Sequence, residues 1–153
     1  MSSSTVDSAR SELLIRSSLG DYEVRFTSDV SGDLEDVLTH GDVVIADRRV
    51  VDLHGDRLQG RFEAHPVIEI DATEDQKSYL ALAPIIRRLG ELGFRRGNRL
   101  VAVGGGITQD VTAFVASMMY RGVEWIYLPT TLLSQADSCI GSKTSINFGE
   151  YLS

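Results

Sequence analysis

The chain has 153 residues, 42% of them hydrophobic, and its 22 acidic residues against 15 Lys and Arg give a formal net charge of −7. This length and composition are typical of a globular protein with one sizeable core, and the length argues against two full domains. The acidic balance argues against a general nucleic-acid-binding protein, which needs a basic face, but a few local cations suffice for one small phosphate.

The sequence contains one cysteine, Cys139, which excludes an intramolecular disulfide framework and fits a reducing compartment. No apolar run approaches the roughly 20 residues that a membrane-spanning helix needs. Residues 1–10 are polar and serine-rich and lack the apolar stretch of a signal peptide. We therefore predict a disordered leader over 1–10 and one α/β domain over 11–153, in a cytoplasmic protein that binds neither membrane nor nucleic acid.

The first elements are predicted to be a β-hairpin and a short helix. The hairpin strands are 12–17 and 22–27, separated by a turn that contains Gly20. Apolar residues at helical spacing predict a helix over 31–40, with Ser31 as its N-cap.

Two strands buried on both faces follow in the sequence. The apolar run 42–47 predicts the first of them, with Asp47 at its carboxyl end, and 66–70 predicts the second. The segment between them, 50–62, is mixed and polar, and we expect a helical turn and a loop there.

The remaining elements alternate between helix and strand. Thr73 is the predicted N-cap of a helix that runs to about residue 92. A strand at 99–103 leads into a glycine-initiated helix that ends at Gly122, and a further strand covers 124–128. This alternation predicts a Rossmann-like α/β fold with a largely parallel sheet flanked by helices.

The strongest local feature is the turn Gly104-Gly105-Gly106, between a strand and a helix. Glycines let a ligand approach the backbone closely, and a helix N-terminus presents free N–H groups to an anion such as a pyrophosphate. The pattern is not GxGxxG, and it lacks the lysine of a P-loop. The alternative is a tight turn that needs glycine for positive φ angles.

Other polar residues lie where strands of a parallel sheet end. Thr130 and Thr131 could hold a ribose or phosphate, or they could cap the next helix. Asp47 is placed to bind a ribose diol, or it simply ends its strand. The segment from Asp137 to residue 147 contains Lys143, which could pair with a phosphate or belong to a solvated loop.

No metal site is predicted. His40, His54 and His65 lack the spacing of metal ligands, and we interpret all three as loop residues. Cys139 has no neighbouring histidine in the sequence, so a packed side chain is favoured over a nucleophile.

Taken together, these segments resemble the 3-dehydroquinate synthase family of sugar-phosphate cyclases. The order and spacing of four segments follow the family pattern: Gly104–Asp110, Tyr120–Val123, Pro129–Ser138 and Gly141–Asn147. Glu74–Lys77 looks like the Glu-x-x-Lys segment of the family. The resemblance implies an NAD-binding half, with zinc or another divalent metal held by a mostly helical half that is absent from this chain.

The resemblance also implies roles for individual residues. The cofactor residues would be Asp47, Glu74, Lys77, Gly104, Gly105, Gly106, Ile107, Asp110, Thr130 and Thr131. Asp137 and Lys143 would face the substrate near the nicotinamide. Arg121 would reach a substrate phosphate in the neighbouring subunit of a homodimer.

The implied activity is that of a carbon–oxygen lyase of the shikimate pathway type. It converts a sugar phosphate, such as 3-deoxy-arabino-heptulosonate 7-phosphate, to a carbocycle with loss of phosphate, and NAD is regenerated in each turnover. Departures from the synthase pattern at Arg49, Thr108, Gln109, Ser142 and Ser145 leave the sugar phosphate undetermined. The 153-residue chain alone is expected to be inactive. The alternative is a non-catalytic module for nucleotide binding or dimerisation.

Overall fold

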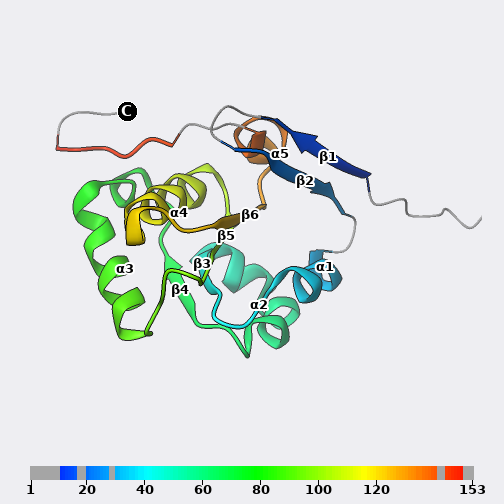
Figure 1. Cartoon of the computed structure of the whole chain (residues 1–153), viewed down its shortest axis with the longest axis horizontal. Coiled ribbons are helices and arrows are strands. Elements are labelled where there is room, and N and C mark those ends of the chain that lie inside the picture. The colour runs from blue at the N-terminus through cyan, green and yellow to red at the C-terminus, as the bar shows by residue number, and fades with distance from the viewer. Residues whose placement is uncertain (1–10, 17–19, 28–29, 141–143, 150–153) are drawn as a thin grey trace, which may run out of the picture. The chain divides into compact units, whose positions relative to one another are not determined.

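The structure, a computed structural model, describes residues 11–16, 20–27, 30–140 and 144–149 (Figure 1). The chain divides into two compact units, one up to residue 37 and the other from residue 38 onward. The predicted leader over 1–10 lies outside the described residues, and so does Lys143.

The first unit contains the predicted hairpin. Its strands β1 (Ser11–Ile15) and β2 (Tyr22–Phe26) are antiparallel, and Ser11 lies opposite Phe26. Helix α1 (Val30–Val37) includes Ser31, so the prediction of Ser31 as N-cap is wrong. The helix also ends at Val37, before residue 40, and the Thr39 N–H beyond it donates to the Asp42 carboxylate at 2.9 Å.

The second unit is built on a four-stranded parallel sheet. Its strands are β3 (Val43–Asp47), β4 (Val67–Ile70), β5 (Leu100–Gly104) and β6 (Trp125–Pro129). The spatial order is β4-β3-β5-β6, and the register places Val43 opposite Leu100. The inner strands β3 and β5 are buried almost throughout, as their apolar runs predict. The outer strand β4 is only partly buried.

Helices cover both faces of this sheet. On one face, α3 (Tyr79–Glu91) and α4 (Gly106–Met118) lie together (Figure 1). They enclose a core whose members include Val43, Ile45, Leu82, Leu89, Val111 and Val115. On the other face, α2 (Arg48–Phe62) packs against β3 and β4. The fold is therefore the predicted Rossmann-like α/β arrangement.

The segment expected to form a helical turn and a loop is instead the 15-residue helix α2. The Asp47 carboxylate caps this helix by accepting a hydrogen bond of 2.9 Å from the Arg49 N–H. Val51, Leu58 and Phe62 recur at i, i+7 and i+11, and Leu58 and Phe62 are buried. Two glycines and many polar residues lie between these apolar residues, and the sequence pattern therefore did not predict the helix.

The single helix predicted from Thr73 to residue 92 is interrupted. A 3-10 turn (Glu74–Gln76) comes first, Thr73 makes no side-chain cap, and α3 begins only at Tyr79. The interruption has a tertiary cause. The Asn147 N–H donates to the Lys77 carbonyl at 2.9 Å, and the Tyr79 N–H donates to the Asn147 carbonyl at 3.0 Å.

Candidate functional site

The strand order creates a switch point between β3 and β5. The chain leaves β3 through α2 toward β4 on one side, whereas β5 lies on the other side of β3. In open parallel sheets, ligands bind beyond the carboxyl ends of the strands at such a point. Asp47 ends β3 and Gly104 ends β5, and their preceding residues, Ala46 and Val103, are paired across the ladder. The predicted glycine turn and Asp47 therefore flank this position.

The glycine turn is not explained by positive φ angles. Gly104, Gly105 and Gly106 are absent from the residues with positive φ, so that alternative is wrong. Packing requires glycine at Gly104 and leaves little room for a side chain at Gly105. A Cβ on Gly104 would lie 2.7 Å from the Thr108 Cβ, and a Cβ on Gly105 would lie 3.1 Å from the Thr131 Cγ2.

Gly106 differs from its two neighbours. Among the described residues, a Cβ at this position would meet only the Ser138 Oγ, at the ordinary contact distance of 3.9 Å. Helix α4 begins here, with Gly105 as an N-cap that makes no side-chain hydrogen bond. The N–H groups of the first turn are therefore not covered by a capping side chain, and they can bind an anion.

The two predicted threonines lie beside this turn. The Thr130 N–H donates to the Gly104 carbonyl at 2.9 Å, as the pairing of β5 with β6 continues past the strand ends. Thr131 also caps helix α5 (Leu132–Ala136): its Oγ1 accepts from the Ser134 N–H at 3.2 Å, and the Ser134 Oγ accepts from the Thr131 N–H at 3.3 Å. The capping alternative thus holds for Thr131, whereas the Thr130 side chain is exposed.

A polar network joins three more of the predicted cofactor residues. The Lys77 Nζ lies 3.0 Å from Asp110 Oδ2, and the two side chains are only 11% and 20% exposed. The Ser145 hydroxyl donates to the same carboxylate at 3.3 Å. The Asn147 Nδ2 donates to the Glu74 Oε1 at 2.9 Å. Asp110, Lys77 and Glu74 therefore hold segment 144–147 in place.

Tyr127 is a site residue that the sequence did not reveal. Its hydroxyl lies 3.3 Å from the Gly104 carbonyl. Burial raises the pKa of Tyr127 above its ordinary value, although hydrogen bonds with Ser134 and Ser138 act in the opposite direction. The hydroxyl therefore stays protonated and can donate a hydrogen bond beside the turn. The sequence could have indicated it through its position on a predicted strand, two residues before Pro129, near the carboxyl end where ligands bind.

The predicted substrate residues are less closely gathered. The predicted cofactor residue Ile107 is partly buried, with its side chain packed against the core. Asp137 follows α5 and is exposed. Within the described ranges, no hydrogen bond or ion pair connects the side chains of Asp137 and Arg121 to the network around Asp110. Lys143 lies outside those ranges.

Arg121 does not end an α-helix, contrary to the prediction. Helix α4 stops at Met118, and a 3-10 turn (Met119–Arg121) follows it. Tyr120 and Arg121 have φ angles of 51° and 71°. The Tyr120 hydroxyl donates to the Phe94 carbonyl at 2.7 Å, which holds this strained turn and leaves Arg121 exposed.

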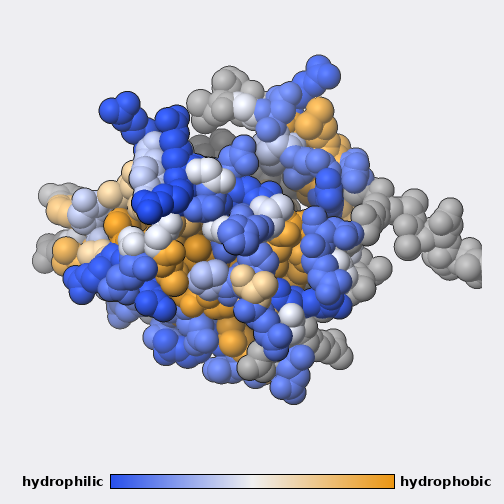
Figure 2. Space-filling model, turned by 60° about the horizontal axis from the view of Figure 1, so that its bottom comes forward, coloured by the Kyte–Doolittle hydropathy of each residue, from blue (hydrophilic) through white to orange (hydrophobic). Residues whose placement is uncertain are grey.

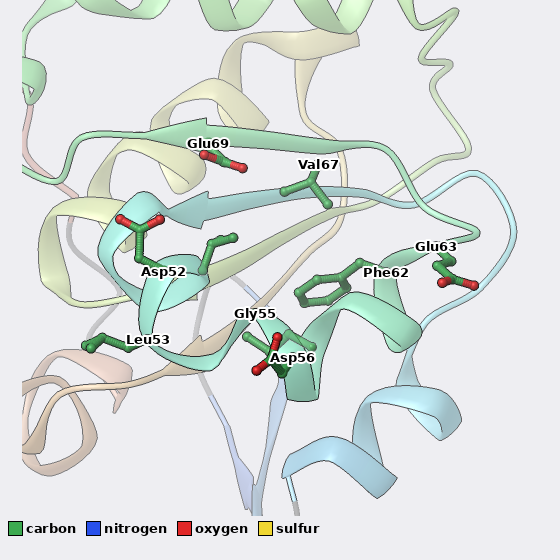
Figure 3. A pocket seen from close by; sticks show the side chains of 10 residues that line it. Asp52, Leu53, Gly55, Asp56, Phe62, Glu63, Val67 and Glu69 are labelled. Atoms are coloured by element: carbon green, nitrogen blue, oxygen red, sulfur yellow. The ribbon is translucent and has the colours of Figure 1, made fainter.

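A groove of about 600 Å³ lies elsewhere, between α2 and β4. Figure 3 shows the Phe62 and Val67 side chains turned toward the same space between the two elements. Four carboxylates line it: Asp52, Asp56, Glu63 and Glu69. It lies against an edge strand, two strands from Gly104, and its acidic lining repels anions. We therefore place the candidate site at the glycine turn.

The face drawn in Figure 2 is largely hydrophilic, with hydrophobic residues in its recesses.

Two further observations on the described part of the chain concern the requirements of a metal site and of a membrane-spanning helix. No three His, Cys, Asp or Glu side chains there gather in a way that could hold a metal ion. None of the helices described combines the length and the apolar character needed to cross a bilayer.

Residues 67–151, more than half of the chain, match the family described as 3-dehydroquinate synthase N-terminal. The chain belongs to the 3-dehydroquinate synthase family. A 3-dehydroquinate synthase from Thermodesulfovibrio yellowstonii is 40% identical over 108 residues, which cover 68% of this chain and 30% of that protein. The matched region spans less than half the length of each of the curated relatives compared with this chain, between 29% and 39%.

Two solved structures have a similar fold. A 2-deoxy-scyllo-inosose synthase complexed with carbaglucose-6-phosphate, NAD⁺ and Co²⁺ is 27% identical, with a TM-score of 0.77 over 90% of this chain and 39% of the other. The 2-epi-5-epi-valiolone synthase of Streptomyces hygroscopicus subsp. jinggangensis 5008, with NAD⁺ and Zn²⁺ bound, is 28% identical. Its TM-score is 0.66, over 78% of this chain and 35% of the other. These relatives have names for three different products, so the family alone does not name a substrate.

Proposed function

We propose that this chain is the NAD-binding N-terminal part of a sugar-phosphate cyclase. The observation that carries the proposal is Gly106, which neither a positive φ nor the packing of the described residues requires. It stands at the uncapped N-terminus of α4, at the switch point of the sheet. A pyrophosphate that approaches the backbone there explains why a side chain is absent. The NAD⁺ in the two related structures supports this choice of ligand.

In this proposal, the backbone N–H groups of Gly105, Gly106 and Ile107 hold the pyrophosphate. Asp47, which keeps a second carboxylate oxygen beside the one that caps α2, takes a ribose hydroxyl. Glu74 and Lys77 serve the adenosine end of the cofactor. Thr130, Thr131 and Asp110 complete the site, and Gly104 brings the turn close to β6.

The substrate side of the proposed site rests on three residues. Asp137 and Lys143 face the substrate near the nicotinamide, and Lys143 contributes a positive charge toward its phosphate. Arg121 reaches the phosphate bound by a second copy of the chain, so we propose a homodimer. A guanidinium suits that role because it binds phosphate through two parallel hydrogen bonds.

The proposed reaction is elimination of phosphate from a sugar phosphate, followed by ring closure to a carbocycle. Bound NAD supplies a reversible hydride acceptor, which makes a ketone whose neighbouring C–H is acidic. This chain contributes the binding and orientation of the reactants. We assign it no metal ligand, because the described residues offer no suitable group. We accordingly propose that these 153 residues alone do not release phosphate from a heptulosonic acid phosphate, even with NAD and zinc added. The single cysteine of the sequence supports the cytoplasm as the compartment.

Calorimetric titration with NAD tests the proposal. Wild-type chain should bind NAD, and Gly106→Ala should bind at least tenfold more weakly, roughly the effect of 1.4 kcal/mol, because the new methyl group blocks the pyrophosphate. The fold should tolerate this methyl group. Gly90→Ala is the matched control, since Gly90 lies within α3 with nothing within 4 Å of a Cβ. Equal affinities of Gly106→Ala and wild type, or no binding at millimolar NAD, would overturn the proposal.

A further inference from the structure

Gln109, in the first turns of α4, reaches a part of the chain beyond α5. Its side chain is only 4% exposed, and its Nε2 donates to the Ser138 carbonyl at 2.8 Å. Ser138 also lies against the glycine turn, since its Oγ would be 3.9 Å from a Cβ on Gly106. The start of α4 and the residues after α5 therefore form one contact region.

The next residue, Asp110, holds the chain on the other side of residues 141–143. The Thr144 hydroxyl donates to the Asp110 carbonyl at 2.9 Å. The Asp110 carboxylate accepts from the hydroxyl and the N–H of Ser145, at 3.3 and 3.4 Å. Two consecutive residues of α4 thus hold both segments that flank 141–143.

Stability alone does not account for the amide of Gln109. Its Oε1 is buried and finds no donor among the described residues, and such an unpaired acceptor is unfavourable. A methionine would fill the same space without this cost. The contribution that only the amide makes is the bond from its Nε2 to Ser138. That bond fixes where the chain lies rather than how strongly the core packs.

We propose that Gln109 is a positioning residue that, with Asp110, ties the glycine turn to the segments on either side of residues 141–143. A ligand bound at the turn then changes the mobility of Asp137–Cys139. This second statement rests on the proposed function, whereas the tie itself does not. In the proposed cyclase, the tie sets Asp137 relative to the bound nicotinamide.

Cys139 is a direct probe of the tie, because it follows Ser138 and is the single cysteine of the sequence. Its side chain is half-buried, and its thiol donates to the Gln135 carbonyl at 3.1 Å. We would measure its rate of modification by a disulfide reagent in the folded chain. In Gln109→Met, that rate should rise about two- to tenfold, the range that the loss of one hydrogen bond allows.

Gln135→Met is the matched control. Gln135 also donates to a backbone carbonyl, that of Pro129 at 3.0 Å, but it is exposed and its carbonyl partner lies on β6, away from the Ser138 carbonyl that Gln109 binds. Its variant should keep the wild-type rate. Equal rates for Gln109→Met and wild type, or an equal rise in Gln135→Met, would overturn the tie. Urea unfolding of each variant separates local loosening from global destabilisation. Gln109→Asn, whose amide is too short to reach Ser138, replaces Gln109→Met if that variant does not fold.

Adding NAD separates the two proposals. Saturating NAD should slow modification of Cys139 in wild type and have a smaller effect in Gln109→Met. If titration shows that wild type binds NAD and the rate does not change, the coupling is wrong. If wild type does not bind NAD, the proposed function fails, and the rates without ligand still decide whether Gln109 holds Ser138.

Discussion

Arg99 and the buried carboxylate of Asp42 form an ion pair that joins the starts of β3 and β5, with Nη2 only 2.6 Å from Oδ2. The Asp42 side chain is 1% exposed and also accepts from the N–H and hydroxyl of Thr39. Arg99 donates a second hydrogen bond to Asp42 through its Nε at 3.1 Å. This pair lies at the amino ends of the central strands, whereas the glycine turn lies at their carboxyl ends. Its effect is therefore on stability and not on the candidate site.

Asp42→Asn should lower the free energy of unfolding by about 3 kcal/mol, since it leaves the Arg99 charge without its buried partner. Urea unfolding measures this loss. Glu91→Gln is the control, because Glu91 pairs with Arg88 at 3.1 Å while both side chains are more than half exposed. That change should cost less than about 1 kcal/mol. Similar losses in the two variants would contradict the assigned role of Asp42.

We also expect the Asp42 carboxylate to make the stability of the chain fall in acid. Burial acts to raise the pKa of Asp42, but hydrogen bonds from Arg99 and Thr39 and the charge of Arg99 together lower it. As the pH falls, Asp42 is therefore protonated in the unfolded chain at a higher pH than in the folded chain. The stabilisation is complete above the unfolded pKa of about 4 and is lost as the pH falls through the lower folded value.

Unfolding experiments between about pH 3 and pH 6 should show this loss in wild type. The dependence should be weaker in Asp42→Asn, which has no proton to bind at that position. Parallel pH profiles for the two proteins would assign the acid sensitivity to other carboxylates.

Lys77→Met should destabilise the chain by about 2 kcal/mol, because among the described residues Asp110 then keeps only Ser145 as a partner for its carboxylate. Hydrogen exchange should also rise at 144–147, the segment that Asp110 holds. Arg88→Met removes the exposed partner of Glu91 and should cost less than about 1 kcal/mol. A Lys77 variant as stable as that control would show that the ion pair contributes little.

Arg121→Gly should make the chain more stable by about 1 kcal/mol, since glycine adopts the observed φ of 71° without steric cost. Thermal unfolding measures the change. Arg96→Gly is the control, because Arg96 is exposed and does not have a positive φ.

Sedimentation of the same variants tests the proposed homodimer, and a wild-type chain that stays monomeric at high concentration would contradict it. Retention of a strained arginine is expected where its guanidinium has a function.

Local patterns in the sequence determined the central strands, the glycine turn and the parallel arrangement. The apolar runs at β3 and β5 are long enough to predict strands buried on both faces, and a glycine turn between strand and helix depends on adjacent residues alone. The resemblance to the cyclase family also rests on such local segments, and the family match over 67–151 confirms it.

Only the tertiary structure decided the features that depend on distant partners. The helix predicted from Thr73 breaks because Asn147 takes the backbone hydrogen bonds of Lys77 and Tyr79. Gln109, which the sequence marked only as a departure from the family, finds its partner 29 residues away at Ser138. Spacing and propensity report on neighbours within a few residues. A hydrogen bond across the fold exists only once the sheet has brought its two ends together.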